Sequence, residues 1–174
     1  MKRVPGLIML LFFTISSWST LSAQNSGGLT FGGGITYGFE LEEVGIQATG
    51  TYAIHDNIRI GTDFIYWISD DDNAFGASIS STLFEINVNL HYLFYNNNNL
   101  IIYAIGSIGM HQANVSFDVP EVGSDSVSDT ELGLAFGGGA EYDLGPIIFY
   151  LEPRFFISGF DQLAISAGLK IPLN

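Results

Sequence analysis

Apolar residues alternate with small or polar residues along most of the chain after Leu29, and the alternation has a period of two. A period of two indicates β-strands, because successive side chains of a strand point to opposite faces of the sheet. The same region shows no convincing helical period. Eight strands are therefore predicted, over Leu29–Phe39, Gly45–Ile54, Ile58–Ile68, Ser81–Phe94, Leu100–His111, Glu131–Tyr142, Ile147–Ser158 and Gln162–Leu173.

Two of these runs carry local exceptions to the alternation. The run Leu100–His111 is apolar on both faces at its start, so its two faces are left unassigned. Pro153 lies inside the seventh run and lacks a backbone N–H donor. We therefore expect a bulge or a local gap in the hydrogen-bond ladder at this proline.

The connections between the runs are of two alternating kinds, tight turns rich in turn-forming residues and segments that are longer or more acidic. Tight turns at one end and acidic loops at the other are typical of an antiparallel up-and-down transmembrane β-barrel. The predicted fold class is therefore all-β, with eight strands. The tight turns are His55–Asn57, Asn96–Asn99 and Asp143–Pro146, and the other connections are Glu40–Val44, Ser69–Ser78, Gln112–Thr130 and Gly159–Asp161.

One face of the predicted strands carries the large apolar side chains. A soluble barrel of the lipocalin kind would turn this face inward, whereas a membrane barrel turns it outward toward lipid. Side-chain size favours the membrane barrel, because the opposite face is rich in Gly, Ser and Thr and also bears charged residues. Aromatic residues near the strand ends are predicted to face lipid as interfacial girdles. They are Phe31, Tyr37, Phe39, Tyr52, Tyr66, Phe84, Tyr92, Phe94, Tyr142 and Phe149.

The opposite face is predicted to line a narrow lumen, because an eight-stranded barrel has room inside only for side chains. Buried charges need partners, so an ion-pair network is the favoured interpretation, with a role in conduction or gating as the alternative. Arg154 is the expected partner of both Asp63 and Glu85, and Arg59 is the second candidate. The predicted network consists of Arg59, Asp63, Glu85, Glu141, Glu152, Arg154 and Lys170.

Two stretches, FGGGITY from Phe31 and FGGGAEY from Phe136, share one pattern: a Phe, three glycines, two variable residues and a Tyr. They lack the spacing and the lysine of phosphate-binding loops, and no helical pattern follows them. The glycines at positions 32, 34, 137 and 139 are instead interpreted as lumen positions that make room for long side chains of neighbouring strands.

The N-terminal stretch predicts export. Lys2 and Arg3 precede an apolar core and a small-residue region that ends at Ala23, which is the order of a secretory signal peptide. Residues 1–23 are expected to be removed, which leaves one barrel domain over residues 24–174. That domain would keep three basic residues, five less Lys2 and Arg3, against 18 acidic ones. This balance argues against nucleic acid as a partner. The chain has no Cys and therefore no disulfide.

With these features the chain resembles the small eight-stranded outer-membrane β-barrels, the group of the OmpA transmembrane domain, OmpX and OmpW, including porin-like barrels of Bacteroidota. The resemblance lies in the strand count, the loop asymmetry, the strand LAFGGGAEYDLG and the final strand LAISAGLKIPLN. The chain departs from the family at Leu173 and Asn174, where an aromatic residue read by the insertion machinery is usual. The resemblance implies the outer membrane of a Gram-negative bacterium, with lipid, lipopolysaccharide and the barrel-insertion machinery as partners.

We expect a protein that is not an enzyme and has no cofactor. Two functions stay open: a structural or surface-interaction barrel with a plugged lumen, and a narrow conduit for small or hydrophobic solutes. His111 is expected to be a solvated side chain at the outer rim, since no Ser nucleophile signature accompanies it. Solvated acidic loops are favoured over a loose divalent-cation site. That weaker alternative would use Asp70, Asp71 and Asp72.

Overall fold

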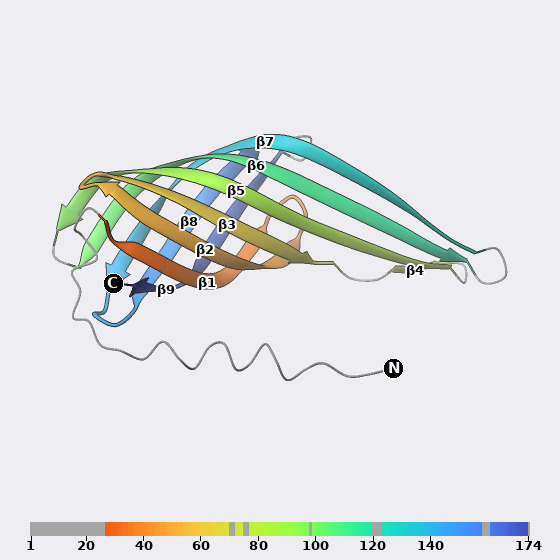
Figure 1. Cartoon of the computed structure of the whole chain (residues 1–174). Coiled ribbons are helices and arrows are strands. Elements are labelled where there is room, and N and C mark those ends of the chain that lie inside the picture. Colours follow the sequence, from red (N-terminus) through yellow and green to blue (C-terminus); the bar gives the residue numbers. More distant parts are fainter. Residues whose placement is uncertain are drawn as a thin grey trace.

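The structure is a computed structural model that describes residues 27–69, 72–74, 77–97, 99–119, 123–157 and 161–173. The predicted signal peptide lies outside the described residues. Strands joined by turns make up the described chain (Figure 1). None of the described residues forms a helix with the length and apolarity that crossing a bilayer requires. The strands are β1 (Leu29–Gly38), β2 (Glu43–His55), β3 (Ile58–Ile68), β4 (Asp72–Ala74), β5 (Ala77–Asn97), β6 (Leu100–Val119), β7 (Gly123–Asp143), β8 (Ile148–Ile157) and β9 (Gln162–Leu173).

Eight of these strands close an antiparallel barrel (Figure 1). β1 pairs with β9 along its whole length, from Leu29 opposite Leu173 to Gly38 opposite Ala164, and this seam closes the cylinder. β3 pairs directly with β5, while the short β4 pairs with the first residues of β5. The prediction of an all-β, eight-stranded antiparallel barrel is confirmed, and β4 is an additional short strand.

The alternation of the sequence decides which side chains point into the barrel. On β8, buried and exposed residues alternate without exception from Ile148 to Ile157. Large apolar side chains lie on the outside, where Ile35 is 63% and Val88 is 64% exposed. The alternative of a soluble barrel with its apolar face inward is therefore wrong, and the buried side chains include many polar and charged ones.

The strand whose faces the sequence left open is β6, and the structure assigns them. Tyr103 lies opposite Gly139 of β7, on the inward face of that strand. Ile108 is exposed on the outer face. Both faces of β6 begin with apolar residues because one face lies on the outside of the barrel and the other lines an apolar section of the lumen. The side chains that form this section are Leu93, Ile101, Tyr103 and Ile105.

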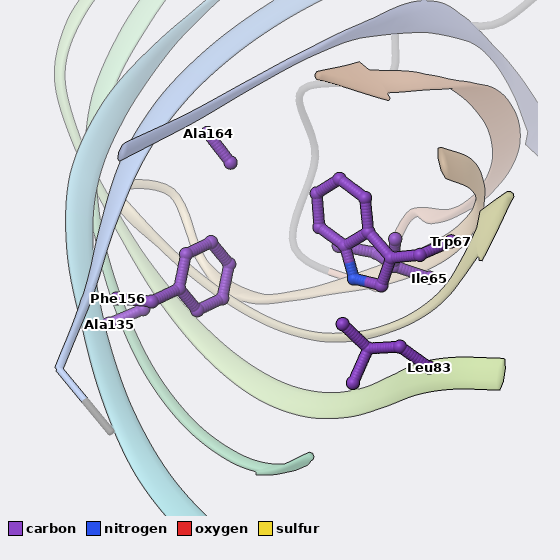
Figure 2. Packing of buried hydrophobic residues seen from close by; sticks show 6 residues of the cluster. All are labelled: Ile65, Trp67, Leu83, Ala135, Phe156 and Ala164. Atoms are coloured by element: carbon purple, nitrogen blue, oxygen red, sulfur yellow. The ribbon is translucent and has the colours of Figure 1, made fainter. Parts of the chain in front are cut away.

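A second apolar cluster fills the barrel near its other end. Side chains from β3, β5, β7, β8 and β9 point into the interior there, with the rings of Trp67 and Phe156 projecting from opposite sides (Figure 2). Small residues flank these rings, so the large side chains occupy the space. The cluster consists of Ile65, Trp67, Leu83, Ala135, Phe156 and Ala164.

β5, β6 and β7 continue far beyond the other strands (Figure 1), since they have 20 or 21 residues whereas the other barrel strands have 10 to 13. The ladder between β3 and β5 ends at Leu83, and that between β7 and β8 begins at Leu134. We call the strand segments past these points the extension. It consists of Ala77–Thr82, Asn114–Val119 and Gly123–Gly133.

The extension contradicts part of the loop prediction. The predicted loop Gln112–Thr130 is mostly a β6–β7 hairpin, with Ser116 paired to Ser126 and Asn114 to Ser128. The predicted loop Ser69–Ser78 likewise contains β4 and the start of β5. Backbone ladders need no apolar side chains. Ser, Asn and Asp therefore form strands here without the alternation by which strands are recognised in a sequence.

The gap expected at Pro153 is present. The ladder between β7 and β8 runs from Leu134 to Gly137, is interrupted opposite Pro153, and resumes at Ala140 without a change of register. Pro153 keeps its pairing with Ile165 on β9. The ladder is therefore weakened on one side only, and the barrel wall stays continuous.

Candidate functional site: the charged lumen

The seven charged residues that the sequence analysis assigned to the lumen all lie inside the barrel. Each of them is 5% exposed or less. They come from five strands. On each strand, every second residue points into the barrel because the side chains alternate with a period of two. Arg59 and Asp63 lie on β3, Glu85 on β5, Glu141 on β7, Glu152 and Arg154 on β8, and Lys170 on β9.

One half of the network is centred on Lys170. Its Nζ lies 2.8 Å from Oε1 of Glu141 and 3.1 Å from Oε1 of Glu152, so one ammonium joins two carboxylates. Arg59 Nη1 donates to the other oxygen of Glu141 at 2.6 Å. The Tyr103 hydroxyl donates to Glu152 Oε1 at 2.5 Å. These contacts join β3, β6, β7, β8 and β9 across the lumen.

The other half is centred on Asp63. Arg154 Nη1 donates to Asp63 Oδ2 at 2.8 Å, the pairing expected from the sequence. The side-chain amides of Asn87 and Asn89 donate to the same carboxylate at 3.0 and 2.5 Å. Arg154 Nη2 also lies 3.7 Å from Glu152 Oε2, which connects this half to the first.

Two details of the expected pairing are wrong. Arg59 lies on Glu141 and not on Asp63, and no contact joins Glu85 to Arg154 among the described ion pairs. The reason for the second is register, since Ile65 rather than Asp63 lies opposite Glu85. The two carboxylates are thus offset by two residues along the barrel, and Glu85 lies nearer the extension.

Glu85 has its own set of partners. Its Oε1 accepts hydrogen bonds from Trp67 Nε1 at 2.9 Å and from Gln162 Nε2 at 3.3 Å. His111 Nδ1 lies 3.3 Å from the same oxygen, and the His111 ring meets the Phe156 ring edge-on at 5.7 Å. His111 is only 3% exposed. The expectation of a solvated His111 at the rim is therefore wrong.

The sequence analysis missed the aromatic side chains that hold the network in place. The Tyr150 ring lies 4.5 Å from Lys170 Nζ, and its hydroxyl donates to Gln47 Oε1 at 2.8 Å. The ring of His91 stacks on Tyr103 at 4.9 Å. Tyr150 shares the parity of Glu152 and could have been assigned inward from that signal. Tyr103 could not, because its strand is apolar on both faces.

The glycines of the two FGGG stretches lie where long lumen side chains pass. A β-carbon on Gly139 would lie 2.5 Å from the Tyr103 hydroxyl oxygen, and one on Gly34 would lie 2.5 Å from that of Tyr150. Gly32 faces the Lys170 stem in the same way, at 2.7 Å. Such distances are too short for a carbon atom, so a side chain at these positions would force the neighbouring groups to shift.

The lumen residues can pair charges, but they do not balance them. Four carboxylates face three permanent cations, and Glu85 is the carboxylate held by neutral donors and a histidine. Buried polar atoms on His91, Asn89 and Ser107 have no hydrogen-bond partner among the described residues. Groups of this kind are usually satisfied by ordered water.

A metal site finds no support in the part of the chain described here, where no group of three or more His, Cys, Asp or Glu side chains is arranged to hold an ion. The weaker alternative at Asp70, Asp71 and Asp72 involves side chains outside the described residues.

The ten aromatic residues predicted to face lipid all lie on the outside of the barrel. Nine are exposed, and Phe84, whose ring lies 5.9 Å from that of Phe64, is half-buried. Tyr37 and Phe39 meet edge-on at 5.1 Å near one end of β1. The arrangement provides the outer surface on which girdles of aromatic residues would lie.

Comparison with known proteins gives one family and several solved folds. A family model described as an outer membrane protein beta-barrel domain matches residues 6–152. Neisserial surface protein A is similar with a TM-score of 0.61 and 14% identity, over 84% of this chain and 97% of that one. Ail of Yersinia pestis gives 0.59 and 13%, over 86% and 100%. The N-terminal barrel of Pseudomonas aeruginosa OprF gives 0.57 and 9%, over 86% and 98%.

Ail has also been solved in complex with the heparin analogue sucrose octasulfate, and that structure is similar with a TM-score of 0.55 and 13% identity, over 83% of this chain and 97% of that one. At these identities the likeness to solved structures concerns the fold alone. No curated protein matches the sequence.

Proposed function

The chain belongs to the outer membrane protein β-barrel domain family, and from that premise we propose that it is a non-enzymatic, non-conducting barrel that acts through its surface. Family membership supports an outer-membrane location, with lipid and lipopolysaccharide around the barrel. Export by the signal peptide over residues 1–23 and membrane entry through the barrel-insertion machinery are parts of the same proposal.

The observation that carries the proposal is the filling of the lumen. Ion pairs from Arg59, Lys170 and Arg154 reach across the interior to carboxylates on other strands. Trp67 and Phe156 fill a further level of the barrel. A barrel of eight strands has little interior volume, so side chains at both levels support a lumen that is closed to hydrated ions.

The experiment is single-channel recording of the refolded protein in planar bilayers. The wild-type barrel is expected to give no discrete current steps, whereas Arg154→Ala should give steps because it opens the ion-pair level and leaves Asp63 as a cation-attracting group. Glu42→Ala, which removes an exposed charge in a turn, is the control and should behave as wild type. Discrete steps from the wild-type protein would contradict the proposal.

A second candidate is a narrow conduit for small or hydrophobic solutes. It is favoured by the unpartnered polar atoms of His91, Asn89 and Ser107, since a chain of water at these atoms would be the start of a path. The same recordings separate the two functions. Uptake of a small sugar into vesicles that contain the wild-type barrel would support the conduit.

The surface role is favoured by the extension, which carries the β-structure well beyond the barrel wall (Figure 1). The ligand in the solved complex of Ail, sucrose octasulfate, is a polyanion. The segment 112–133 of this chain contains five acidic residues and no Lys or Arg: Asp118, Glu121, Asp125, Asp129 and Glu131. Repulsion between like charges argues against a polyanionic ligand here. We infer that the partners of this surface are neutral or positively charged.

A further inference from the structure

The outer surface of the barrel changes from apolar to polar within one level of β6 and β7. Met110 of β6 lies opposite Leu132 of β7, and both belong to the apolar wall. Two residues further along β6, Gln112 lies opposite Thr130, and at the level after that Asn114 lies opposite Ser128. Thr82 of β5 continues this second polar level, because it pairs with Asn114. We call the polar residues of these two levels the neutral face: Thr82, Gln112, Asn114, Ser128 and Thr130.

The carboxylates beside these levels lie on the other side of the sheet. Asp129 and Glu131 alternate with Ser128 and Thr130 along β7, so their side chains point away from the neutral face. Residues 77–82 and 112–133 include no Lys or Arg. The side chains of residues 117–125 lie outside the described residues, and the neutral face is therefore defined over its two levels only. This separation of charged from neutral side chains indicates that the two sides of the sheet meet different surroundings.

The neutral face lies at the level where the acyl chains of the membrane end. In the outer-membrane pattern the tight turns face the periplasm, which puts the extension at the exterior end. Because the neutral face continues the lipid-facing wall, it faces sideways into the layer directly above the acyl chains. In a leaflet of lipopolysaccharide this layer consists of sugar rings and phosphate groups. Phosphates repel carboxylates, which explains why Asp129 and Glu131 are turned to the other side.

Resting on the proposed surface function, we propose that the neutral face binds the saccharide of lipopolysaccharide molecules that lie beside the barrel. Hydroxyl and amide side chains both donate and accept hydrogen bonds, as the hydroxyl groups of sugars do. Ser128 and Thr130 are exposed, and the other three side chains are half-buried. Neighbours within a level of a sheet are about 5 Å apart and successive levels about 7 Å apart, so one sugar chain can contact several of them. The groups bound are neutral, in agreement with the partners inferred above for this surface.

The test measures equilibrium binding of fluorescently labelled lipopolysaccharide to the full chain refolded in detergent micelles. Lipid A is the first comparison, because it keeps the acyl chains and phosphates but has no saccharide beyond its two innermost sugars. The core saccharide released from the same lipopolysaccharide is the second comparison, because it keeps the sugars without the acyl chains.

Two variants change the neutral face, and a third is a matched control. Asn114→Ala with Ser128→Ala removes side-chain hydrogen bonds, and Asn114→Asp with Ser128→Asp adds two carboxylates. The control is Val115→Asp with Val127→Asp, since these valines lie directly opposite each other on the same two strands and point to the other side of the sheet. Urea titration without lipopolysaccharide checks that each variant is folded.

We expect the wild-type protein to bind lipopolysaccharide at least tenfold more tightly than lipid A or the free core saccharide. The Ala pair should weaken lipopolysaccharide binding by about tenfold, the effect of losing a few hydrogen bonds, and leave lipid A binding unchanged. The Asp pair on the neutral face should weaken it further, because its carboxylates would meet the phosphates. The control pair should bind as wild type.

Four outcomes would overturn the proposal. Equal binding of lipopolysaccharide and lipid A would show that the saccharide is not bound, and equal losses from the two Asp pairs would show that the neutral face is not the site. Free core saccharide that binds as tightly as lipopolysaccharide would indicate a site for a soluble glycan instead. A dimer that only the wild type forms would indicate a contact between barrels. None of these outcomes depends on whether the lumen conducts, so bilayer recordings distinguish a failure here from a failure of the proposed non-conducting function.

Discussion

Arg154 contributes its guanidinium to both halves of the lumen network, because it contacts Asp63 on β3 and Glu152 on its own strand. An exposed ion pair contributes little to stability. A buried carboxylate that loses its counter-charge is strongly destabilising. The cost of removing Arg154 is therefore determined mainly by the carboxylate left behind and less by the hydrogen bond that is lost.

Arg154→Ala should lower the free energy of unfolding by about 3 to 5 kcal/mol, the range for breaking a buried ion pair. Urea titration of the barrel refolded into lipid vesicles measures this. Adding Asp63→Asn to the same variant should recover part of the loss, because the unpaired charge is removed while one of the two amide contacts, from Asn87 or Asn89, keeps an acceptor oxygen. Equal losses in the single and double variants would show that packing, not charge, is responsible.

Gly139→Ala should destabilise the barrel by about 1 to 3 kcal/mol, the usual cost of overpacking, because its β-carbon would meet the Tyr103 ring. Gly106→Ala is the matched control on the neighbouring strand, where a β-carbon would find nothing within 4 Å. It should be neutral or stabilise by about 0.4 to 1 kcal/mol, since Ala reduces the freedom of the unfolded chain. Equal effects of the two substitutions in urea titrations would contradict the steric explanation.

The sequence was sufficient to assign lumen residues to a face but not to all of their partners. Parity alone places Asp63 and Arg154 inside, and the order of strands around a closed barrel places them across from each other. Parity cannot determine register. Because Glu85 is offset by two residues from Asp63, it contacts Trp67, Gln162 and His111 instead of Arg154.

At the scale of the element, the strands were predictable only where they separate two environments. Along β8, lipid on one side and lumen on the other produce a strict alternation. In the extension both faces lie beyond the barrel wall, so Ser, Thr and Asn occupy either face and the alternation disappears. The sequence of the outer part of the β6–β7 hairpin therefore predicted a loop, although the hydrogen-bond ladder between the two strands is continuous.

Two equally exposed valines test this difference between the barrel wall and the extension. Val88 on β5 is 64% exposed, and Val127 on β7 is 62% exposed. Val88→Arg should cost about 2 to 4 kcal/mol in a bilayer, as a charge does near the membrane midplane. Val127→Arg should have little effect on stability. Refolding titrations in vesicles measure both costs. A similar cost for the two substitutions would contradict the assignment of Val88 to the membrane-facing wall and of Val127 to the extension outside the membrane.

At the scale of the whole molecule, the barrel has two unlike ends. One end carries tight turns such as that after Asp143, where Gly145 has a φ of 95°. The other end carries the extension, in which the described part of β7 includes Asp129 and Glu131. In the outer-membrane barrel pattern, short turns face the periplasm and long segments face the outside. The extension is therefore expected to face the exterior of the cell.

Single cysteines test this orientation without background, because the chain has no Cys of its own. Ser128→Cys on β7 should react with a membrane-impermeant thiol reagent on intact cells. Asn97→Cys, at the last residue of β5, should react only after the outer membrane is broken. Labelling of Asn97→Cys on intact cells, with Ser128→Cys protected, would reverse the topology.

The seam between β1 and β9 determines the order in which the barrel can be made. The other pairings of the wall join strands close together in the chain, so they can form once the second strand is available. The seam can form only once the last strand is available. The chain loses the entropy of ring closure before it gains any contact across the seam. Until it forms, β1 and β9 expose backbone groups that hydrocarbon does not tolerate. Membrane entry and ring closure are therefore coupled steps, and loss of the final strand would stop both.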